Sequence, residues 1–361
     1  MANPNKPFAW ELGEFGLIDR IRQLFPDIDL TDDCALIGLP TSGKLLITTD
    51  AAIRGTHFPE DGRYISDGGF RGFAGAVSDI NASAGRPLGA LLALVIPKDL
   101  LLSEFDSFMS GVVEYSSISG VPLIGGNITR GDRFGATFTI IGTSERPVAR
   151  ASAKPGDLLV LTGAVGGSEA GRMLITGEVE TKGIERKVID ALKNQHLRPI
   201  PPLGTGERLA KLGATAIIDI SDGFLADAAH IAETSGVKIG IELANLPLFP
   251  GVEEVAEIAG LNPYLLAAKS GEEFEIIASV PLGTDLCVSL ENGQARGPAP
   301  TIPPVGANLV FAHSPNNDNR QSGKRVLRTP TIIGEVSEGK GLKITLNGES
   351  VEPKDVGWRH F

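Results

Sequence analysis

The stretch Asp219-Ile220-Ser221-Asp222-Gly223 follows the apolar run Ala214–Ile218 and precedes the helical pattern Phe224–Thr234. It predicts a strand, a tight turn that glycine permits, and a helix. Its two carboxylates can face one hard cation, and the N–H groups that begin the helix point toward the same place, where a phosphate would bind. An ordinary helix N-cap explains a Ser-Asp pair about as well. A second acidic group elsewhere in the chain favours a site for metal and phosphate together.

That second group lies near two other predicted strands. Asp32 and Asp33 precede the short apolar strand Cys34–Ile37, and the strand Lys44–Thr49 is expected to finish at Asp50. Asp32 can be only a solvated neighbour of Asp33, and Cys34 is most simply a small buried side chain. The pattern therefore predicts that strand ends bring several carboxylates to one place.

The composition limits the class of protein. A net charge of −11 argues against general nucleic-acid binding, and 361 residues with 42% hydrophobic content predict two compact domains. Two cysteines are too few for a disulfide framework and favour a reducing compartment. We find no signal peptide and no apolar run of the roughly 18–20 residues that a membrane span needs. The protein is expected in the cytoplasm, without nucleic-acid or membrane partners.

The order of elements predicts an α+β protein with halves at residues 1–150 and 151–361. Prolines and charges at Glu145–Gly156 interrupt any periodicity and mark the boundary. In the first half we expect helices at Glu14–Phe25, Gly68–Ser83 and Ser103–Ser117 and strands at Leu88–Ile96, Val121–Ile124 and Ala136–Gly142.

The second half begins with the strand Asp157–Leu161, the glycine-rich turn Thr162–Ser168 and the helix Glu169–Thr176. Such a turn can cradle phosphate, but it lacks the lysine of a P-loop, so a plain tight turn is the favoured interpretation. Residues 291–330 are rich in Pro, Gly and Asn and predict an exposed insertion. Elsewhere in this half we expect a helix at Val252–Ile258 and strands at Lys238–Leu243, Ile276–Val280, Thr331–Val336 and Leu342–Leu346.

Several motifs, ordinary when taken singly, are specific in their order and spacing. They are Gly13-Glu14-Phe15, Asp32-Asp33-Cys34-Ala35, Thr48-Thr49-Asp50 with His57-Phe58, Ser78-Asp79, Gly125-Gly126-Asn127 with Thr129-Arg130-Gly131, Ala153-Lys154-Pro155-Gly156-Asp157, Ile218-Asp219-Ile220-Ser221-Asp222-Gly223, Ser270-Gly271-Glu272-Glu273 and Gly357-Trp358-Arg359-His360-Phe361. Together they resemble the thiamine-monophosphate kinases of the aminoimidazole-ribonucleotide synthetase-like superfamily over nearly the whole chain.

The resemblance implies a fold and a reaction. The N-terminal half would form a β-barrel that spans a homodimer, a C-terminal α+β half would follow, and the active site would lie in the cleft between the halves. The family transfers the γ-phosphoryl group of ATP to thiamine monophosphate and uses Mg²⁺. Because the acceptor is already an ionised phosphate, this chemistry needs aligned and neutralised anions rather than a strong base.

The resemblance also implies residue roles. Asp33, Asp50, Asp219 and Asp222 would be catalytic and would bind magnesium, with Thr49 helping through its backbone. Gly126, Asn127, Arg150 and Ser221 would face ATP, and His57, Asp79, Glu272 and Trp358 would line the acceptor pocket. An indole ring attracts a cationic thiazolium, although a lone Trp358 is more often a packing anchor, and His57 can be a satisfied hydrogen-bonded residue.

The chain departs from the family pattern within these motifs. Asn127 stands where the family usually has a metal-binding aspartate. Leu30-Thr31 replaces the usual glycines before the paired aspartates, and Ala76-Val77 replaces the usual Asn-Leu before Ser78-Asp79. Near the end of the chain, Trp358-Arg359 replaces the more usual Tyr-Asp. These changes leave open a paralogue with another phosphorylated acceptor, or a nucleotide-binding protein with reduced catalysis. A selenophosphate synthetase would carry a reactive N-terminal cysteine, and a hydrogenase-maturation protein would end in cysteine rather than Phe361, so both are disfavoured.

Overall fold

The computed structural model describes residues 8–26, 42–284 and 330–352. The helices of these segments are α1 (Gly13–Leu24), α2 (Ile65–Ala82), α3 (Leu102–Ser119), α4 (Gly167–Thr176), α5 (Arg186–Leu197), α6 (Thr205–Lys211), α7 (Phe224–Ser235), α8 (Val252–Ala259) and α9 (Pro263–Lys269). The strands are β1 (Lys44–Ile53), β2 (Arg86–Ile96), β3 (Leu123–Arg130), β4 (Gly135–Ser144), β5 (Asp157–Leu161), β6 (Ala216–Asp219), β7 (Lys238–Glu242), β8 (Ile276–Pro281), β9 (Thr331–Ser337), β10 (Gly341–Leu346) and β11 (Glu349–Ser350).

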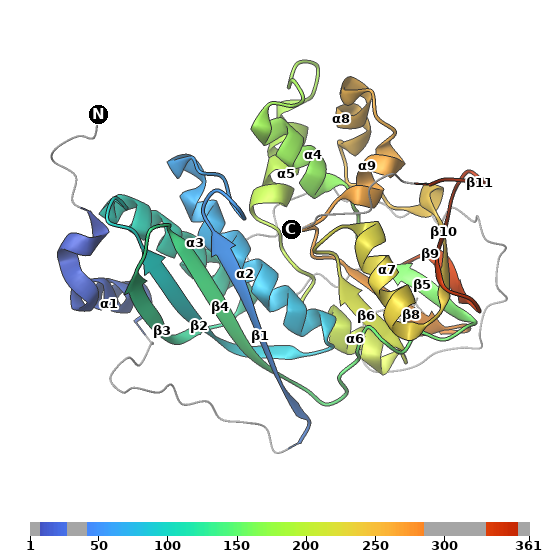
Figure 1. Cartoon of the computed structure of the whole chain (residues 1–361), viewed down its shortest axis with the longest axis horizontal. Coiled ribbons are helices and arrows are strands. Elements are labelled where there is room, and N and C mark those ends of the chain that lie inside the picture. Colours follow the sequence, from blue (N-terminus) through green and yellow to red (C-terminus); the bar gives the residue numbers. More distant parts are fainter. Residues whose placement is uncertain (1–7, 27–41, 285–329, 353–361) are drawn as a thin grey trace.

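The N-terminal half is an open mixed sheet with helices on one face. Its described strands follow the order β1-β4-β2-β3, in which β2 and β3 are parallel and the other pairs antiparallel. Helices α2 and α3 cover one face of this sheet (Figure 1). Phe73 of α2 stacks on Phe138 of β4 with ring centroids 5.2 Å apart. Burying each such ring contributes about 2–3 kcal/mol, so the aromatic layer fixes α2 on the sheet.

Glycines let α2 and α3 cross with their backbones almost in contact. A Cβ atom at Gly111 of α3 would lie 1.9 Å from the carbonyl oxygen of Ser66, and one at Gly69 of α2 would lie 2.2 Å from that of Phe108. No side chain fits at either position. The small residues that the sequence places in α2 are therefore needed for close helix packing.

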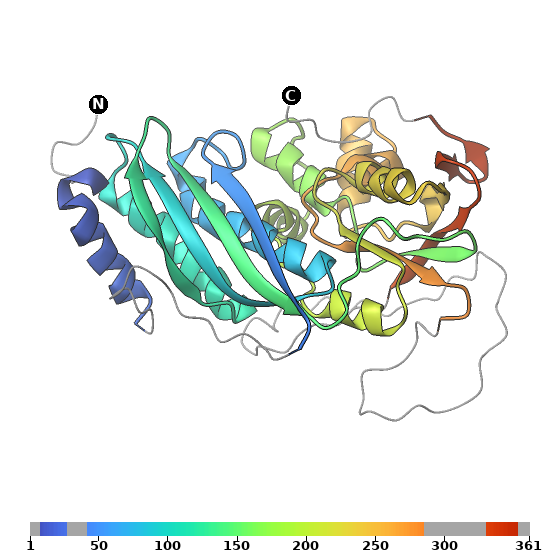
Figure 2. The same ribbon diagram turned by 60° about the horizontal axis from the view of Figure 1, so that its bottom comes forward.

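The C-terminal half has a larger mixed sheet. Among the described residues its strand order is β11-β10-β7-β9-β5-β8-β6, with β7 and β10 parallel. Helix α7 packs beside this sheet, and α4, α5, α8 and α9 form a separate helical group with its own apolar core (Figures 1 and 2). Together the two halves form the expected α+β fold. Among the described residues, β1 and β3 are the outer strands of the N-terminal sheet.

Helix α2 also packs against the C-terminal half. Asp67, Arg71, Ser78 and Asn81 recur along one stripe of the helix, and each contacts a residue beyond position 190. Asn81, for example, accepts hydrogen bonds from the backbone N–H groups of Gly204 (3.1 Å) and Gly206 (3.2 Å). A helix with one face on a sheet and the other on a second domain is buried all round, as its composition requires.

Two predicted strand ends are wrong. Asp50 lies inside β1, which continues to Ile53, and β3 continues through the polar segment Gly125–Arg130. Both strands extend because their backbones keep pairing with β4 and β2, whatever the polarity of the side chains. The boundary at residues 145–156 contains neither helix nor strand, as expected. The insertion at 291–330 lies outside the described residues except for Pro330.

No helix in the described segments is long and apolar enough to cross a membrane.

Candidate active site

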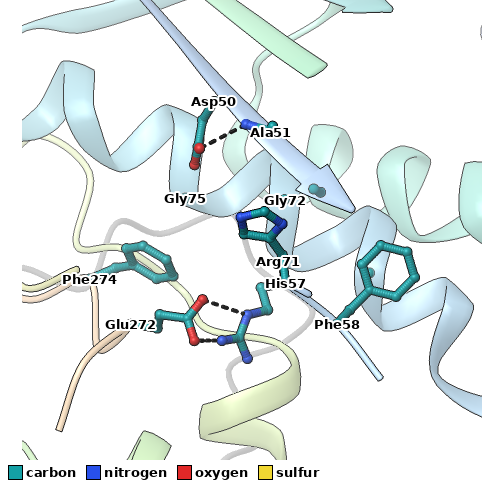
Figure 3. A pocket seen from close by; sticks show the side chains of 11 residues that line it. Asp50, Ala51, His57, Phe58, Arg71, Gly72, Gly75, Glu272 and Phe274 are labelled. Atoms are coloured by element: carbon teal, nitrogen blue, oxygen red, sulfur yellow. Dashed lines mark hydrogen bonds and ion pairs between the residues drawn. The ribbon is translucent and has the colours of Figure 1, made fainter. Parts of the chain in front are cut away.

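A pocket lies where the two halves meet (Figure 3). Asp50 comes from β1, His57 from the turn after it, Arg71 from α2, and Glu272 and Phe274 from the turn that precedes β8. Each half thus supplies a carboxylate, and α2 supplies a cation. The arrangement suits a polar ligand held between the halves.

Three aspartates from separate elements share one electrostatic environment beside this pocket. Asp79 of α2 accepts a hydrogen bond from Thr48 Oγ1 at 2.6 Å, and Asp219 of β6 accepts one from Ser78 Oγ at 2.6 Å. Burial, with repulsion from Asp50, raises the pKa of Asp79 to about 6. Burial, with repulsion from Asp79 and Asp50, raises the pKa of Asp219 to about 7. The fold holds these carboxylates together against their repulsion.

The donor set fits a hard divalent cation. Asp50, Asp79 and Asp219 offer carboxylate oxygens, which are the ligands that Mg²⁺ prefers. Burial is the main cause of the raised pKa values of Asp79 and Asp219, and a cation among these carboxylates would offset both the lost hydration and the added repulsion. Asp222, Asp227 and His230 form an adjacent group whose ligand atoms lie within 4.8 Å of one another. Asp50, Asp79 and Asp219 thus interact electrostatically, Asp222 belongs to the adjacent group, and the binding of magnesium by these residues stays a prediction.

The turn at the start of α7 differs from the expected phosphate cradle. Oδ2 of Asp227 accepts hydrogen bonds from the backbone N–H groups of Ser221 (3.0 Å), Asp222 (3.1 Å) and Gly223 (3.1 Å). Burial, with repulsion from Asp219, raises the pKa of Asp227 to about 8. Because this carboxyl group takes the place of an external anion, the expectation of free N–H groups here is wrong.

The glycine-rich turn before α4 is likewise filled from within. Oε1 of buried Glu273 accepts hydrogen bonds from the N–H groups of Gly166 (2.8 Å) and Ser168 (3.0 Å). Ser270 Oγ and Gln195 Nε2 also donate to this carboxylate. The plain-turn interpretation of residues 162–168 therefore describes the structure better than a phosphate cradle.

The turn Ser270–Glu275 is joined to the Asp219–Gly223 stretch along its length. Glu272 N–H donates to the carbonyl of Ser221 at 2.8 Å, and Phe274 N–H donates to that of Ile220 at 3.0 Å. A Cβ atom at Gly271 would lie 2.7 Å from the carbonyl oxygen of Ser221. Two motifs that the sequence separates by about fifty residues form one structural unit at the pocket.

The predicted acceptor-site residues come together only in part. His57 and Glu272 line the same pocket, and His57 Nδ1 accepts a hydrogen bond from Ile53 N–H at 3.1 Å. Asp79 interacts with Asp50 and Asp219 and does not belong to the pocket wall. The side chain of Thr49 bonds Thr139 across the sheet, 3.2 Å away, which leaves only its backbone for the predicted role. Asp33 and Trp358 lie outside the described residues.

Gly126 and Asn127 lie on the opposite edge of the sheet from Asp50. The register runs from Asp50 through Phe138 and Leu92 to Gly126, which is three strand spacings of about 4.8 Å, or roughly 14 Å. Within one chain Asn127 therefore does not share a cation with Asp50.

Arg150 lies apart from the start of α7. Its carbonyl accepts hydrogen bonds from Thr234 (3.1 Å) and Ser235 (3.3 Å), at the C-terminal end of that helix. Twelve helical residues span about 18 Å, so the backbone of Arg150 is one helix length from Asp222. The fold does not bring this predicted ATP contact to the acidic turn.

The sequence analysis did not identify Arg71, Asp227 or Phe274 as site residues. An acid in the first turn of a helix after Asp-Gly is a recognisable signal for Asp227, because such a residue caps the free N–H groups. Arg71 was the only long charged side chain inside the Gly- and Ala-rich pattern Gly68–Ser83. Phe274 had no signal of its own, since its place in the pocket depends on a turn that sequence spacing does not reveal.

Comparisons with known proteins identify similar sequences and similar folds. Residues 31–144 match the family described as "AIR synthase related protein, N-terminal domain". A structure described as "AaThiL complexed with AMPPCP and TMP" has a TM-score of 0.70 at 32% identity and covers 97% of this chain and 98% of its own. The hydrogenase maturation protein HypE in complex with ATP shares the fold alone, with a TM-score of 0.67, 15% identity and 96% coverage of both chains. The thiamine-monophosphate kinase of Aquifex aeolicus is 34% identical over 353 residues, or 97% of this chain and 99% of its own, so the protein belongs to the thiamine-monophosphate kinase family.

Proposed function

We propose that this protein transfers the γ-phosphoryl group of ATP to thiamine monophosphate and releases thiamine diphosphate and ADP. The observation that carries the proposal is the meeting of Asp50, Asp79 and Asp219 beside a pocket formed by both halves of a chain of this family. A related structure is described as holding AMPPCP and TMP. These are a nucleotide and a phosphorylated acceptor of the class that such a pocket would take.

The reaction breaks the bond between the γ-phosphorus and the β,γ-bridging oxygen and forms a bond from that phosphorus to an acceptor phosphate oxygen. The acceptor oxygen is already ionised at neutral pH, so no side chain needs to remove a proton from it. Magnesium, when bound, would neutralise and align the phosphate groups. Asp50, Asp219 and Asp222 would hold the ion, and the pocket with His57 and Glu272 would orient the acceptor.

A paralogue acting on another phosphorylated acceptor, or a nucleotide-binding protein with reduced catalysis, is the second candidate. Asn127 favours it, because an amide replaces the carboxylate that the family usually has there. Incubating the protein with ATP, magnesium and thiamine monophosphate, and measuring thiamine diphosphate and ADP separately, distinguishes the candidates. Equal formation of both supports the kinase. ADP without thiamine diphosphate would mean transfer to water. If neither product forms, ADP that appears only after another phosphorylated compound is added supports another acceptor, and its continued absence supports lost catalysis.

The oligomeric state is part of the proposal. We propose a homodimer formed through the N-terminal sheet, with the barrel closed by a second copy. On the face opposite α2, Ile47 of β1 is 64% exposed and pairs in register with Ile141 of β4. Exposed apolar strands beside open sheet edges favour association. Such a dimer could also bring the second copy's β3 near a site that Asn127 does not reach within its own chain.

Light scattering at micromolar concentration should therefore give the mass of a dimer. Ile47→Lys should shift the protein toward monomer, because a charge would be buried in the interface. Ile258→Lys on α8 is the matched control, since Ile258 is also an exposed isoleucine but lies in the other half. A monomeric wild type, or equal effects of the two substitutions, would contradict this interface.

We expect Asn127→Asp to lower the magnesium concentration that half-saturates ATP turnover with thiamine monophosphate. An aspartate supplies the charge that the amide lacks while keeping nearly the same size. The measurement is a magnesium titration of the two proteins at fixed ATP. No shift, with a wild type already saturated at low magnesium, would mean that position 127 does not bind a cation.

The cytoplasmic location stays a prediction.

A further inference from the structure

The turn Ser270–Glu275 holds two residues in a backbone conformation that ordinary side chains rarely adopt. Glu272 has φ 54° and Phe274 has φ 52°, both in the left-handed region. A residue other than glycine is strained in this region unless the surrounding structure compensates. Both residues line the pocket, and their backbone strain indicates that contacts with other parts of the protein hold the turn in this conformation.

One support comes from the C-terminal half. Glu273, between the two strained residues, is 2% exposed and accepts hydrogen bonds from Gly166, Ser168, Ser270 and Gln195. Burial raises the pKa of this carboxyl group to about 7. These hydrogen bonds fix the turn at Glu273, but none of them involves the Glu272 carboxylate.

The second support comes from the N-terminal half. Arg71 Nε donates to Glu272 Oε1 at 3.2 Å, and its Nη2 forms an ion pair with Glu272 Oε2 (Figure 3). Nη1 donates to the carbonyl of His196, at the end of α5. All three guanidinium nitrogens thus have protein partners. The Arg71 side chain is 7% exposed, whereas that of Glu272 is 39% exposed.

We propose that Arg71 is a positioning residue of the acceptor site, which acts by holding the Glu272 carboxylate in the pocket. This inference rests on the proposed function for its kinetic consequence. A guanidinium fork fixes a carboxylate in two directions, which the single ammonium group of lysine cannot do. Because the carbonyl of His196 belongs to the C-terminal half, Arg71 also joins α2 to that half.

Removing Arg71 should release Glu272. Two carboxylates, Asp50 and Glu272, would then line one pocket without the cation that pairs with Glu272, and repulsion would favour a Glu272 rotamer in solvent. We therefore expect Arg71→Met to raise the KM for thiamine monophosphate by about 10- to 100-fold and to leave the KM for ATP within about twofold. Arg71→Lys should recover only part of the loss.

Arg198→Met is the matched control. Arg198 also joins the halves, through Asp67 and Glu114, but it does not line the pocket. If Arg71 acts through Glu272, then Arg71→Met should add little to the KM of a Glu272→Gln variant. Full additivity, an equal rise in both KM values, or the same acceptor effect from Arg198→Met would overturn the proposal.

A readout that needs no kinase activity separates this inference from the proposed function. Hydrogen exchange of residues 270–275 should quicken in Arg71→Met and in Arg71→Lys, but not in Arg198→Met. A wild type that makes no thiamine diphosphate would refute the function and leave this exchange result as the test of positioning. Unchanged exchange in both Arg71 variants would overturn the positioning role, and Arg71→Lys serves if the methionine variant does not fold.

Discussion

Asp222→Ala should abolish phosphoryl transfer, with a loss of at least about a thousand-fold in kcat, because several kcal/mol of charge stabilisation depend on a bound cation and its ligands. The fold should survive. Asp222 is half-buried, and its backbone N–H keeps its bond to Asp227 whatever side chain it carries. Repulsion from Asp222 contributes to the raised pKa of Asp227, so removing the charge should leave the melting temperature unchanged or higher without magnesium.

The measurement is kcat with saturating ATP and acceptor over a range of magnesium concentrations, together with thermal unfolding. Asp190→Ala is the matched control, since Asp190 is an exposed aspartate of α5 paired with Arg186 outside the site. It makes the same change of charge and should leave turnover intact. Near-normal activity of Asp222→Ala with the magnesium dependence of the wild type would remove Asp222 from the metal site.

Glu273→Gln should change how stability depends on pH. Burial raises the pKa of Glu273 from 4.5 to about 7, so the folded protein holds this proton more tightly than the unfolded chain does. The contribution of the carboxyl group to stability is therefore complete below pH 4.5 and is lost as pH rises through about 7. An amide does not titrate, but it keeps an acceptor for the N–H groups of Gly166 and Ser168.

The free energy of unfolding of the wild type, relative to that of Glu273→Gln, should accordingly fall by about 3 kcal/mol between pH 4.5 and pH 8. Urea unfolding at four pH values in this range measures it. Other titrating groups are common to both proteins and cancel in the difference. Parallel profiles for the two proteins would mean that Glu273 ionises in the folded state as it does in the unfolded chain.

Most helices and strands could be predicted because each needs only a local pattern. The stripe of Phe70, Phe73 and Val77 predicted α2, and all three side chains are buried. The helices α6 and α9 have seven residues each, which is too short for a period to emerge, and α5 also received no prediction. The predicted end of β1 at Asp50 was wrong because a polar side chain does not stop the backbone from pairing with the next strand.

The part of the candidate site that could be predicted from sequence is the part whose motifs contain acidic residues. Asp50, Asp219 and Asp222 were found from charge next to predicted strands, and His57 and Glu272 from resemblance. The partner of Glu272 could not be found, because Arg71 lies 201 residues away and nothing local to either residue indicates the pairing. The same holds for Glu273, whose carboxylate fills a turn over a hundred residues earlier in the chain.

The stripe of α2 that contacts the C-terminal half has a consequence for how the molecule melts. If either half unfolded alone, Asn81 and Arg71 would lose the partners that the other half supplies, and the apolar surface packed between the halves would be exposed to water. Such a partly folded state is disfavoured at several points at once. We therefore expect the two sheets, despite their separate cores, to unfold in one calorimetric transition.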